Sequence, residues 1–189
     1  PPIENPDRRA SAEGSFRAFL DTYFPHRFPL PWSGDHIEYI ADIQRAVLEG
    51  GLQATALPRG SGKTTIAECA MIWGALTGRV PFGVLLGATK PASFELLDSI
   101  RTEFETNELL LADFPEACYP IRKLEGTNQK RMFFEGKPVR CKVMKEMILL
   151  PNLPGAKSAG AIIRTAGLTG RVRGMKYTRT DGSIVRPSF

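Results

Sequence analysis

The chain has 189 residues, of which 42% are hydrophobic and 24% charged, and its formal net charge is +5. These values are ordinary for one globular domain and exclude disordered, collagen-like and low-complexity chains. No stretch approaches the roughly 18 uninterrupted apolar residues that a membrane span needs, and the opening PPIENPDRRA lacks the apolar core of a signal peptide. We therefore expect a cytosolic protein that does not contact a membrane.

The cysteines and histidines predict no metal centre. Cys69, Cys118 and Cys141 are odd in number, widely spaced and free of any C-x-x-C pair, which argues against a disulfide framework or a zinc site. We expect three reduced thiols that belong to the core. His26 and His36 have no acidic or cysteine partner at metal-ligand spacing, so structural roles are expected for both.

The charge is unevenly distributed. Residues 1–120 hold 10 basic and 16 acidic residues, whereas residues 121–189 hold 15 basic and 4 acidic residues. A basic C-terminal third suits a polyanionic partner, because each neutralised phosphate releases counterions. The alternative is a solvated basic surface, and charge alone does not separate the two.

Two helices are expected in the first fifty residues. Residues 13–23 place four apolar side chains on one helical face: Phe16, Phe19, Leu20 and Tyr23. The proline- and aromatic-rich stretch that follows is expected to be an ordered loop. Asp35 can cap a second helix, which Gly50 and Gly51 end. Its apolar stripe consists of Ile37, Ile40, Ile43, Val47 and Leu48.

The next segments alternate between strands and helices. LQATAL at residues 52–57 and FGVLLGA at residues 82–88 are predicted strands, and a helix is expected after each, at residues 64–76 and 91–105. The second strand is apolar on both faces, as central parallel strands are. The order predicts an α/β fold with a parallel sheet, helices beside it and right-handed crossovers.

The pattern loosens after residue 111. The stretch DFPEACYPIRKLEGTNQ, residues 113–129, is interpreted as an excursion across the surface. Residues 131–150 predict a hairpin around Glu135 and Gly136, and GAIIRTA at residues 160–166 predicts another buried strand. The remainder is glycine-rich, basic and irregular.

The run ALPRGSGKTT lies between a predicted strand and a predicted helix, which is the context that a phosphate-binding loop (Walker A motif) requires. Gly60 and Gly62 let the backbone curl so that successive N–H groups point at one anion, and the helix adds its positive end. Lys63 can reach the β and γ phosphates of ATP, and the Thr64 hydroxyl can ligate Mg²⁺. The residues predicted to hold the nucleotide are Pro58, Arg59, Gly60, Ser61, Gly62, Lys63, Thr64 and Thr65.

The loop departs from the usual pattern at two positions. Leu57 stands where G-x-x-x-x-G-K-[ST] has its first glycine, which leaves open an ordinary glycine-rich turn that happens to contain a lysine. Arg59 lies where most such loops carry a neutral residue. Its guanidinium can contact the γ phosphate, or it can pair with a neighbouring carboxylate.

Several segments in order resemble the large terminase subunit of tailed bacteriophages, the ATPase that drives double-stranded DNA through a portal into a procapsid. They cover most of the chain and are FPLPWSGDHIEYIADIQRAV, ALPRGSGKTT, FGVLLGAT, DFPEACYPI, GLTGRVRG and DGSIVRP. The loop arginine is moderately specific for this family, and the ordered series of segments is more so.

The resemblance implies a P-loop NTPase fold of the additional-strand, RecA-like kind. Residues 1–51 would form a helical lead-in on the adenine side, and residues 52–189 the ATPase core. Lys63 and Arg59 would act in catalysis, with Thr64 on Mg²⁺. Trp32 and Gln44 would contact adenine, although Trp32 can equally pack under the sheet and Gln44 can face solvent.

Family members continue past a segment like DGSIVRP into a strand that ends in paired acids (Walker B) and then into a nuclease domain. No strand predicted here ends in a carboxylate, and the chain ends at Phe189. We therefore expect an incomplete sheet and no nuclease domain. We also expect that this chain binds ATP but hydrolyses it poorly or not at all alone. An engineered truncation, a split gene and an interrupted reading frame are all open.

The resemblance also implies partners and a location. They are double-stranded DNA, the portal protein, the small terminase subunit and further copies of the chain on the portal, in the bacterial host cytoplasm. Arg171 and Arg173 lie in a glycine-flanked basic loop that can enter a neighbouring nucleotide site, contact DNA phosphates or be a simple surface turn. Three lysines can add to the same surface: Lys142, Lys145 and Lys157.

Two alternatives to the motor remain. A helicase-like P-loop ATPase fragment would use the same loop, and a non-catalytic nucleotide-binding or DNA-binding module would use the fold as a scaffold. Thr89 and Lys90, just past the second predicted strand, occupy a position that couples ATP state to substrate in related motors.

Overall fold

The computed structural model describes residues 1–168, 174–179 and 182–187. Its helices, in chain order, are α1 (Pro6–Gly14), α2 (Phe16–Tyr23), α3 (Gly34–Glu49), α4 (Lys63–Leu76), α5 (Lys90–Thr106), α6 (Glu108–Asp113) and α7 (Pro115–Arg122). Its strands are β1 (Phe82–Gly87), β2 (Met132–Phe134), β3 (Lys137–Val139), β4 (Lys142–Met144), β5 (Met147–Leu149), β6 (Ile162–Gly167), β7 (Tyr177–Thr178) and β8 (Ile184–Val185).

The main sheet has four strands in the order β1-β6-β5-β4, and it is mixed. β1 runs parallel to β6, with Phe82 opposite Ile162. β5 is antiparallel to both β6 and β4. The predicted parallel pairing is therefore confirmed for β1 and β6, but the sheet as a whole is mixed. Only a tight turn separates β4 from β5, so this pair must be antiparallel, whereas the long connection from β1 to β6 contains helices and permits parallel pairing.

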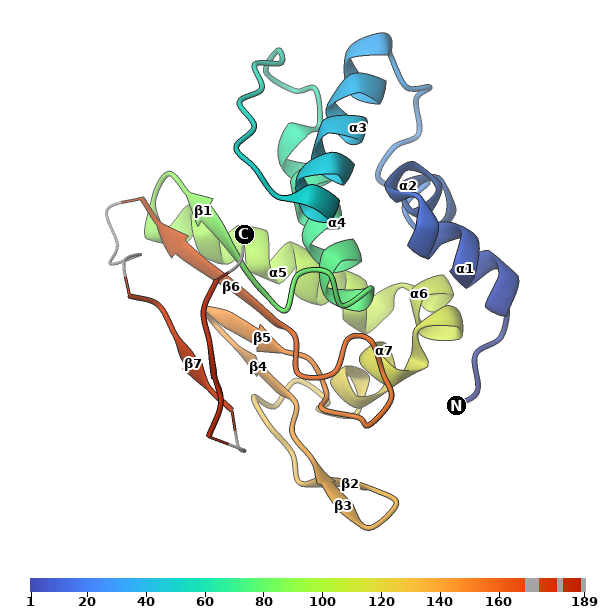
Figure 1. The fold of residues 1–189 in the computed structure, drawn as a ribbon, viewed down its shortest axis with the longest axis vertical. Coiled ribbons are helices and arrows are strands. Elements are labelled where there is room, and N and C mark those ends of the chain that lie inside the picture. Colours follow the sequence, from blue (N-terminus) through green and yellow to red (C-terminus); the bar gives the residue numbers. More distant parts are fainter. Residues whose placement is uncertain (169–173, 180–181, 188–189) are drawn as a thin grey trace.

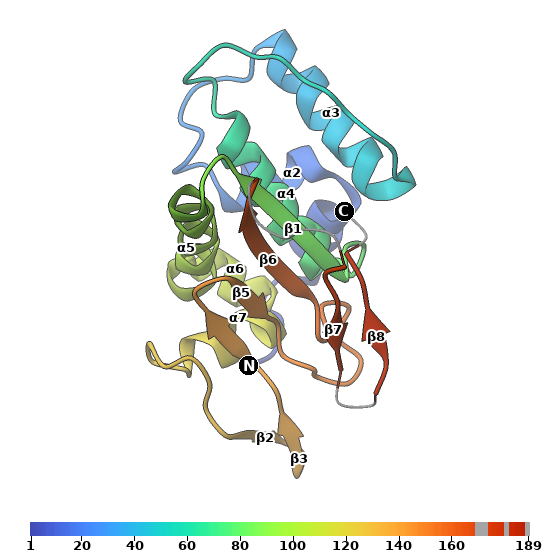
Figure 2. The same cartoon turned by 90° about the vertical axis from the view of Figure 1, so that its left-hand side faces the viewer.

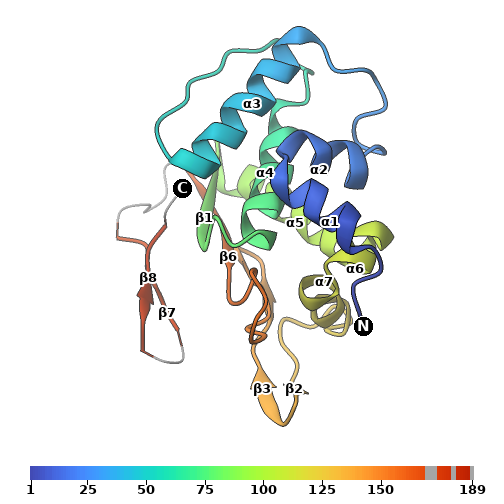
Figure 3. The same cartoon turned by 45° about the vertical axis from the view of Figure 1, so that its right-hand side comes forward.

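Helices cover one face of the sheet, and the β7–β8 hairpin covers the other (Figures 2 and 3). Adjacent residues on β6 show the alternation: Ile163 belongs to the large core beneath the helices, and Ile162 packs with Phe82 in a small cluster. Tyr177 and Val185 of the hairpin pack against that small cluster. The period-2 geometry of a strand thus divides its side chains between two layers.

Helix α4 runs through the centre of the molecule (Figure 1). Every residue from Glu68 to Leu76 is buried, on all sides of the helix. Trp73, at 0% exposure, stacks 5.2 Å from Phe16, and its Nε1 donates to the carbonyl oxygen of Ala12. Helices α1 and α2 are therefore docked directly on α4, in the same apolar core.

Two polar networks tie the helices together. The buried carboxylate of Asp113 accepts hydrogen bonds from Arg8 and from the hydroxyl of Tyr23, which joins α1 and α2 to α6. Arg27 donates to the buried carboxylate of Glu68 at 2.6 Å and to Ser99, which joins the loop before α3 to α4 and α5. Buried charges of this kind persist because they are paired and hydrogen-bonded.

The N-terminal helices differ from the prediction in their boundaries. The segment 13–23 is divided at Ser15, which ends α1 and caps α2 by accepting from the N–H of Ala18. Helix α3 is capped by Ser33 rather than by Asp35, and it ends at Gly50 as expected. In the α3 stripe Ile40 and Val47 are buried, whereas Ile37 and Leu48 are exposed.

The strand predicted at residues 52–57 is not formed. These residues have no strand pairing in the described part of the chain, and Leu52 is fully exposed. The local pattern of LQATAL suits a strand, but a strand is stable only when a neighbour accepts its backbone hydrogen bonds. Its small alanines also bury too little apolar surface to compensate.

Residues 113–129 were wrongly predicted to cross the surface. Helix α7 begins at Pro115, a residue favoured at a helix start, and it buries Ala117, Cys118 and Ile121 in the core. Pro115 and Pro120 obscured a helical pattern that burial stabilises. The turn at Glu135 and Gly136 was predicted correctly, with positive φ at both residues, but residues 131–150 form two hairpins, β2–β3 and β4–β5, rather than one.

The C-terminal part of the chain contains a strand and a short hairpin. The strand expected at residues 160–166 is present as β6, shifted by one or two residues. The tail interpreted as irregular contains the short β7–β8 hairpin. No helix within the described residues is long and apolar enough to cross a membrane.

Candidate phosphate-binding site

The predicted phosphate loop is an exposed turn that leads directly into α4. Gly60 and Gly62 have φ values of 84° and 76°, a left-handed region that an L side chain rarely adopts. Gly62 occupies the N-cap position, and no side chain among the described residues caps the helix there. The first N–H groups of α4 are therefore directed at the loop without a side-chain acceptor, which is the arrangement that binds anions.

Lys63 is the first residue of α4, and its side chain folds back over the loop. The ammonium group donates to the carbonyl oxygens of Leu57 at 2.6 Å and Pro58 at 2.7 Å, and it lies 3.4 Å from Ser61 Oγ. A lysine in this position adds a full positive charge to the positive end of the helix. The two left-handed glycines and the ammonium thus lie in one eight-residue segment.

Helix α3 holds the loop in place through His36. Its Nδ1 accepts from the N–H of Ser33, so the ring hydrogen is on Nε2, which donates to the carbonyl oxygen of Ser61 at 2.8 Å. One turn further along α3, the hydroxyl of Tyr39 donates to the carbonyl oxygen of Lys63 at 3.5 Å. Burial raises the pKa of Tyr39, which keeps this phenol a neutral donor. Both residues position the loop.

Sequence reasoning missed His36 and Tyr39 as residues of the site. A signal was available, because they are three positions apart and therefore share one face of a helix. His36 is also three positions after Ser33, the spacing of a capping box, which the structure contains. What the sequence does not reveal is that this face of α3 meets the loop.

Trp32 lies next to this contact. Its ring is 4.8 Å from Phe28 and 5.8 Å from His36, and its Nε1 donates to Asp21 at 2.6 Å. Phe28 in turn lies 3.8 Å from the point where a Cβ of residue 62 would be. The aromatic rings therefore form a partly exposed wall beside the loop.

Gln44 is not part of this wall. Its Oε1 accepts from the N–H of Phe16 at 2.7 Å, so the side chain caps the first turn of α2. Gln44 is also 11 residues after Ser33 along α3, about 16 Å at 1.5 Å per residue. The structure thus separates the two residues that were predicted to contact adenine together.

The remaining loop residues are accessible. Pro58, Arg59 and Gly60 are exposed, and so is Thr64 in the first turn of α4. Thr65 is half-buried. Thr64 and Arg59 are therefore accessible to a ligand from solvent. Among the described residues, no cluster of three or more His, Cys, Asp or Glu side chains can hold a metal ion.

The other predicted residues lie elsewhere. Arg171 and Arg173 are outside the described residues. Lys145 Nζ lies 4.7 Å from the ring of Phe94, and Lys157 pairs with Glu13. Lys142 is half-buried on β4.

Two positions past β1 have structural partners. Thr89 caps α5 by accepting from the N–H of Ala92, and Lys90 pairs with Glu146 at 2.8 Å. Glu146 belongs to the turn between β4 and β5. The Lys90–Glu146 pair thus connects the end of β1 with the antiparallel part of the sheet, whereas the Thr89 contact is local to α5.

His26 and the three cysteines also have defined surroundings in the structure. His26 Nε2 lies 3.0 Å from the carboxylate of Glu103, within the Arg27 network. Cys69, Cys118 and Cys141 are free and buried, as predicted. Burial raises the pKa of all three thiols, that of Cys141 to about 12. Such thiols are not nucleophiles at neutral pH.

Comparison of the chain with models of protein families, with curated proteins and with solved structures gave no match. The assignment of a function therefore depends on the loop, on the residues around it and on the segments that resemble terminases.

Proposed function

We propose that the loop from Pro58 to Thr65 binds the phosphates of Mg-ATP, and that the chain is the ATP-binding part of a terminase large subunit with a RecA-like P-loop fold. The observation that carries this is the junction of Gly62 and α4. There, a left-handed glycine, an uncapped helix start and the Lys63 ammonium converge within a few residues.

The chain supplies a specific part of the chemistry. Lys63 and the first N–H groups of α4 neutralise and orient the phosphates, and Thr64 provides an oxygen ligand for Mg²⁺. Arg59 adds a second cation to the same turn, and Trp32 with Phe28 forms an apolar wall for the base. Bound Mg-ATP supplies the phosphoryl group whose transfer drives DNA translocation in terminases.

The basic C-terminal third supports the DNA part of the proposal. Residues 121–189 carry 15 basic and 4 acidic residues, so this part of the chain attracts a polyanion. Contacts to phosphates position a protein on DNA without reading its sequence, as a translocating motor requires. The portal protein, the small terminase subunit and further copies of the chain are the other proposed partners.

Equilibrium binding of Mg-ATP to the wild type and to Lys63→Ala tests the nucleotide site. We expect the variant to bind at least about tenfold more weakly, since a charge-assisted hydrogen bond contributes about 1.5–3 kcal/mol. Lys176→Ala, which removes an exposed lysine outside the loop, is the matched control and should bind normally. Equal binding by all three proteins, or by none, would contradict the proposal.

Hydrolysis measured in the same samples tests the second part. We expect little or no phosphate release from either protein, because no predicted strand of this chain ends in the acidic pair that activates water in the family. Turnover that depends on Lys63 would contradict this expectation while supporting nucleotide binding.

DNA binding that ATP and Lys63→Ala leave unchanged would favour the scaffold alternative.

A further inference from the structure

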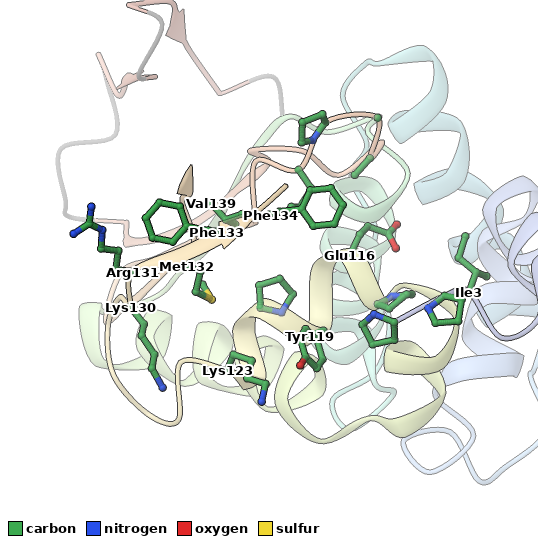
Figure 4. A pocket seen from close by; sticks show the side chains of 18 of the residues that line it. Ile3, Glu116, Tyr119, Lys123, Lys130, Arg131, Met132, Phe133, Phe134 and Val139 are labelled. Atoms are coloured by element: carbon green, nitrogen blue, oxygen red, sulfur yellow. The ribbon is translucent and has the colours of Figure 1, made fainter. Parts of the chain in front are cut away.

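A second site lies between α7 and the β2–β3 hairpin, and no residue of the phosphate loop lines it (Figure 4). It is an open groove of about 740 Å³, a size typical of sites that bury a ligand or a short peptide segment. The groove is built by segments that are far apart in the sequence, which are the N-terminal residues 1–3 with Arg9, α7, the hairpin and the loop at residues 153–156.

The walls of the groove are apolar. Its aliphatic lining consists of Pro1, Pro2, Ile3, Pro115, Pro120, Met132, Val139, Leu153, Pro154 and Ala156. Proline rings and aliphatic side chains offer contact area without hydrogen-bonding groups, so they favour an apolar occupant. The prolines are also conformationally fixed, and binding to them therefore costs little side-chain entropy.

Three aromatic side chains stand exposed along the groove. Tyr119 is 40% exposed, Phe133 56% and Phe134 45%. Tyr119 comes from α7 and the two phenylalanines from the hairpin, on either side of the groove (Figure 4). Aromatic residues gathered in this way on a surface are typical of protein interfaces, where they supply much of the binding energy.

Cations border the aromatic rings. Lys123 Nζ lies 5.3 Å from the ring centre of Tyr119, and the Arg131 guanidinium lies 5.2 Å from that of Phe133. Lys130 also lines the groove, but its ammonium is paired with Glu125 at 2.9 Å, so Lys123 and Arg131 are the cations that carry the argument. The one carboxylate among its described lining residues, Glu116, is paired with Arg9 at 2.7 Å. The rim is therefore positive and the interior apolar.

We propose that this groove binds a segment of a partner protein that carries apolar anchor residues flanked by Asp or Glu. The apolar walls would bury the anchors, and Lys123 and Arg131 would attract the acidic flanks. A single-stranded nucleic acid fits less well, because it requires cations along the whole path of its backbone, whereas these lie at the rim. The proposal is independent of the nucleotide site.

Random peptides displayed on phage and selected on the intact 189-residue chain test this. Enriched peptides are synthesised, and their affinities are measured by fluorescence polarisation for the wild type, Phe134→Ser and Arg131→Glu. We expect sequences with apolar cores and acidic flanks, bound at least about tenfold more weakly by both variants. Added salt should weaken binding to the wild type more than to Arg131→Glu.

Two matched variants control for general effects of polarity and charge. Leu30→Ser removes another exposed apolar side chain, and Arg45→Glu inverts another exposed arginine. Both should bind the selected peptides as the wild type does. Thermal unfolding of every variant shows that the fold is retained.

Three results would overturn the proposal. The first is that no family of acidic peptides with apolar anchors is selected, or that the selected peptides bind both groove variants as tightly as the wild type. Another is a mixed-sequence single-stranded oligonucleotide that binds the wild type, loses affinity with Phe134→Ser and displaces the peptides. The third is self-association in light scattering that Phe134→Ser abolishes, because the occupant would then be a second copy of the chain.

Discussion

The two ends of helix α4 have opposite environments. At its C-terminal end Trp73 is enclosed by Phe16, the backbone of Ala12 and the guanidinium of Arg79, 4.6 Å from the indole ring. At its N-terminal end Thr64 is exposed, and no side chain among the described residues caps the helix. One end is fixed by packing, and the other presents backbone donors to solvent.

This difference would allow α4 to carry the proposed phosphate-binding loop. An anion site needs helix amides without internal partners, and those amides contribute nothing to stability by themselves. Helix α4 is held in place by the nine residues from Glu68 to Leu76, all buried, so its first turn is free for other interactions. Substitutions at the fixed end should therefore change stability, and those at the loop end should change binding.

The largest effect is expected at the fixed end. Trp73→Ala should lower the free energy of unfolding by about 4 kcal/mol, because it leaves a cavity and removes the hydrogen bond to Ala12. Trp32→Ala, which shortens a half-buried tryptophan, should cost about 1 kcal/mol. Urea denaturation measures both. Similar losses for the two variants would show that α4 is not anchored as described.

A somewhat smaller effect is expected at Asp113, which anchors α1 and α2. Burial opposes its ionisation, but hydrogen bonds from Arg8 and Tyr23 outweigh burial and lower its pKa. Asp113→Asn should cost about 3 kcal/mol at neutral pH, because it breaks a buried ionic network.

The lowered pKa of Asp113 also predicts that the free energy of unfolding depends on pH. Because the pKa of Asp113 is lower in the folded state than in the unfolded chain, its ionisation stabilises the fold fully above the unfolded-state pKa, about 4. This stabilisation is lost as the pH falls through the folded-state pKa. The difference in unfolding free energy between wild type and Asp113→Asn should therefore shrink below about pH 4. A difference that stays constant as the pH is lowered well below the unfolded-state pKa would contradict the role given to this carboxylate.

The smallest effects on stability are expected at two glycines with left-handed backbone conformations, of which only one lies in the proposed binding loop. Gly62→Ala and Gly136→Ala place a side chain at φ values of 76° and 73°, so each should cost about 1 kcal/mol. Only Gly62→Ala should also weaken Mg-ATP binding, since it redirects the amides of the loop. Loss of nucleotide affinity in Gly136→Ala, or normal affinity in Gly62→Ala, would place the site elsewhere.

Local patterns in the sequence were sufficient for most elements. The spacing of Phe16, Phe19 and Tyr23 indicated the face of α2 that is buried, and the pair Glu135-Gly136 indicated the first hairpin turn. Glycines around Ser61 and the lysine after them indicated the loop. These properties depend on side-chain periodicity and on φ preferences, which neighbouring residues determine.

The sequence by itself thus determined the helices α2 to α5, the turn at Glu135 and Gly136, and the glycine-rich turn that leads into α4. Tertiary structure alone decided that residues 52–57 are not a strand, that β5 is antiparallel, that α7 is buried and that His36 contacts Ser61. The physical reason is that strand pairing, burial and contacts between distant residues depend on which neighbour is available. A local pattern does not encode that neighbour.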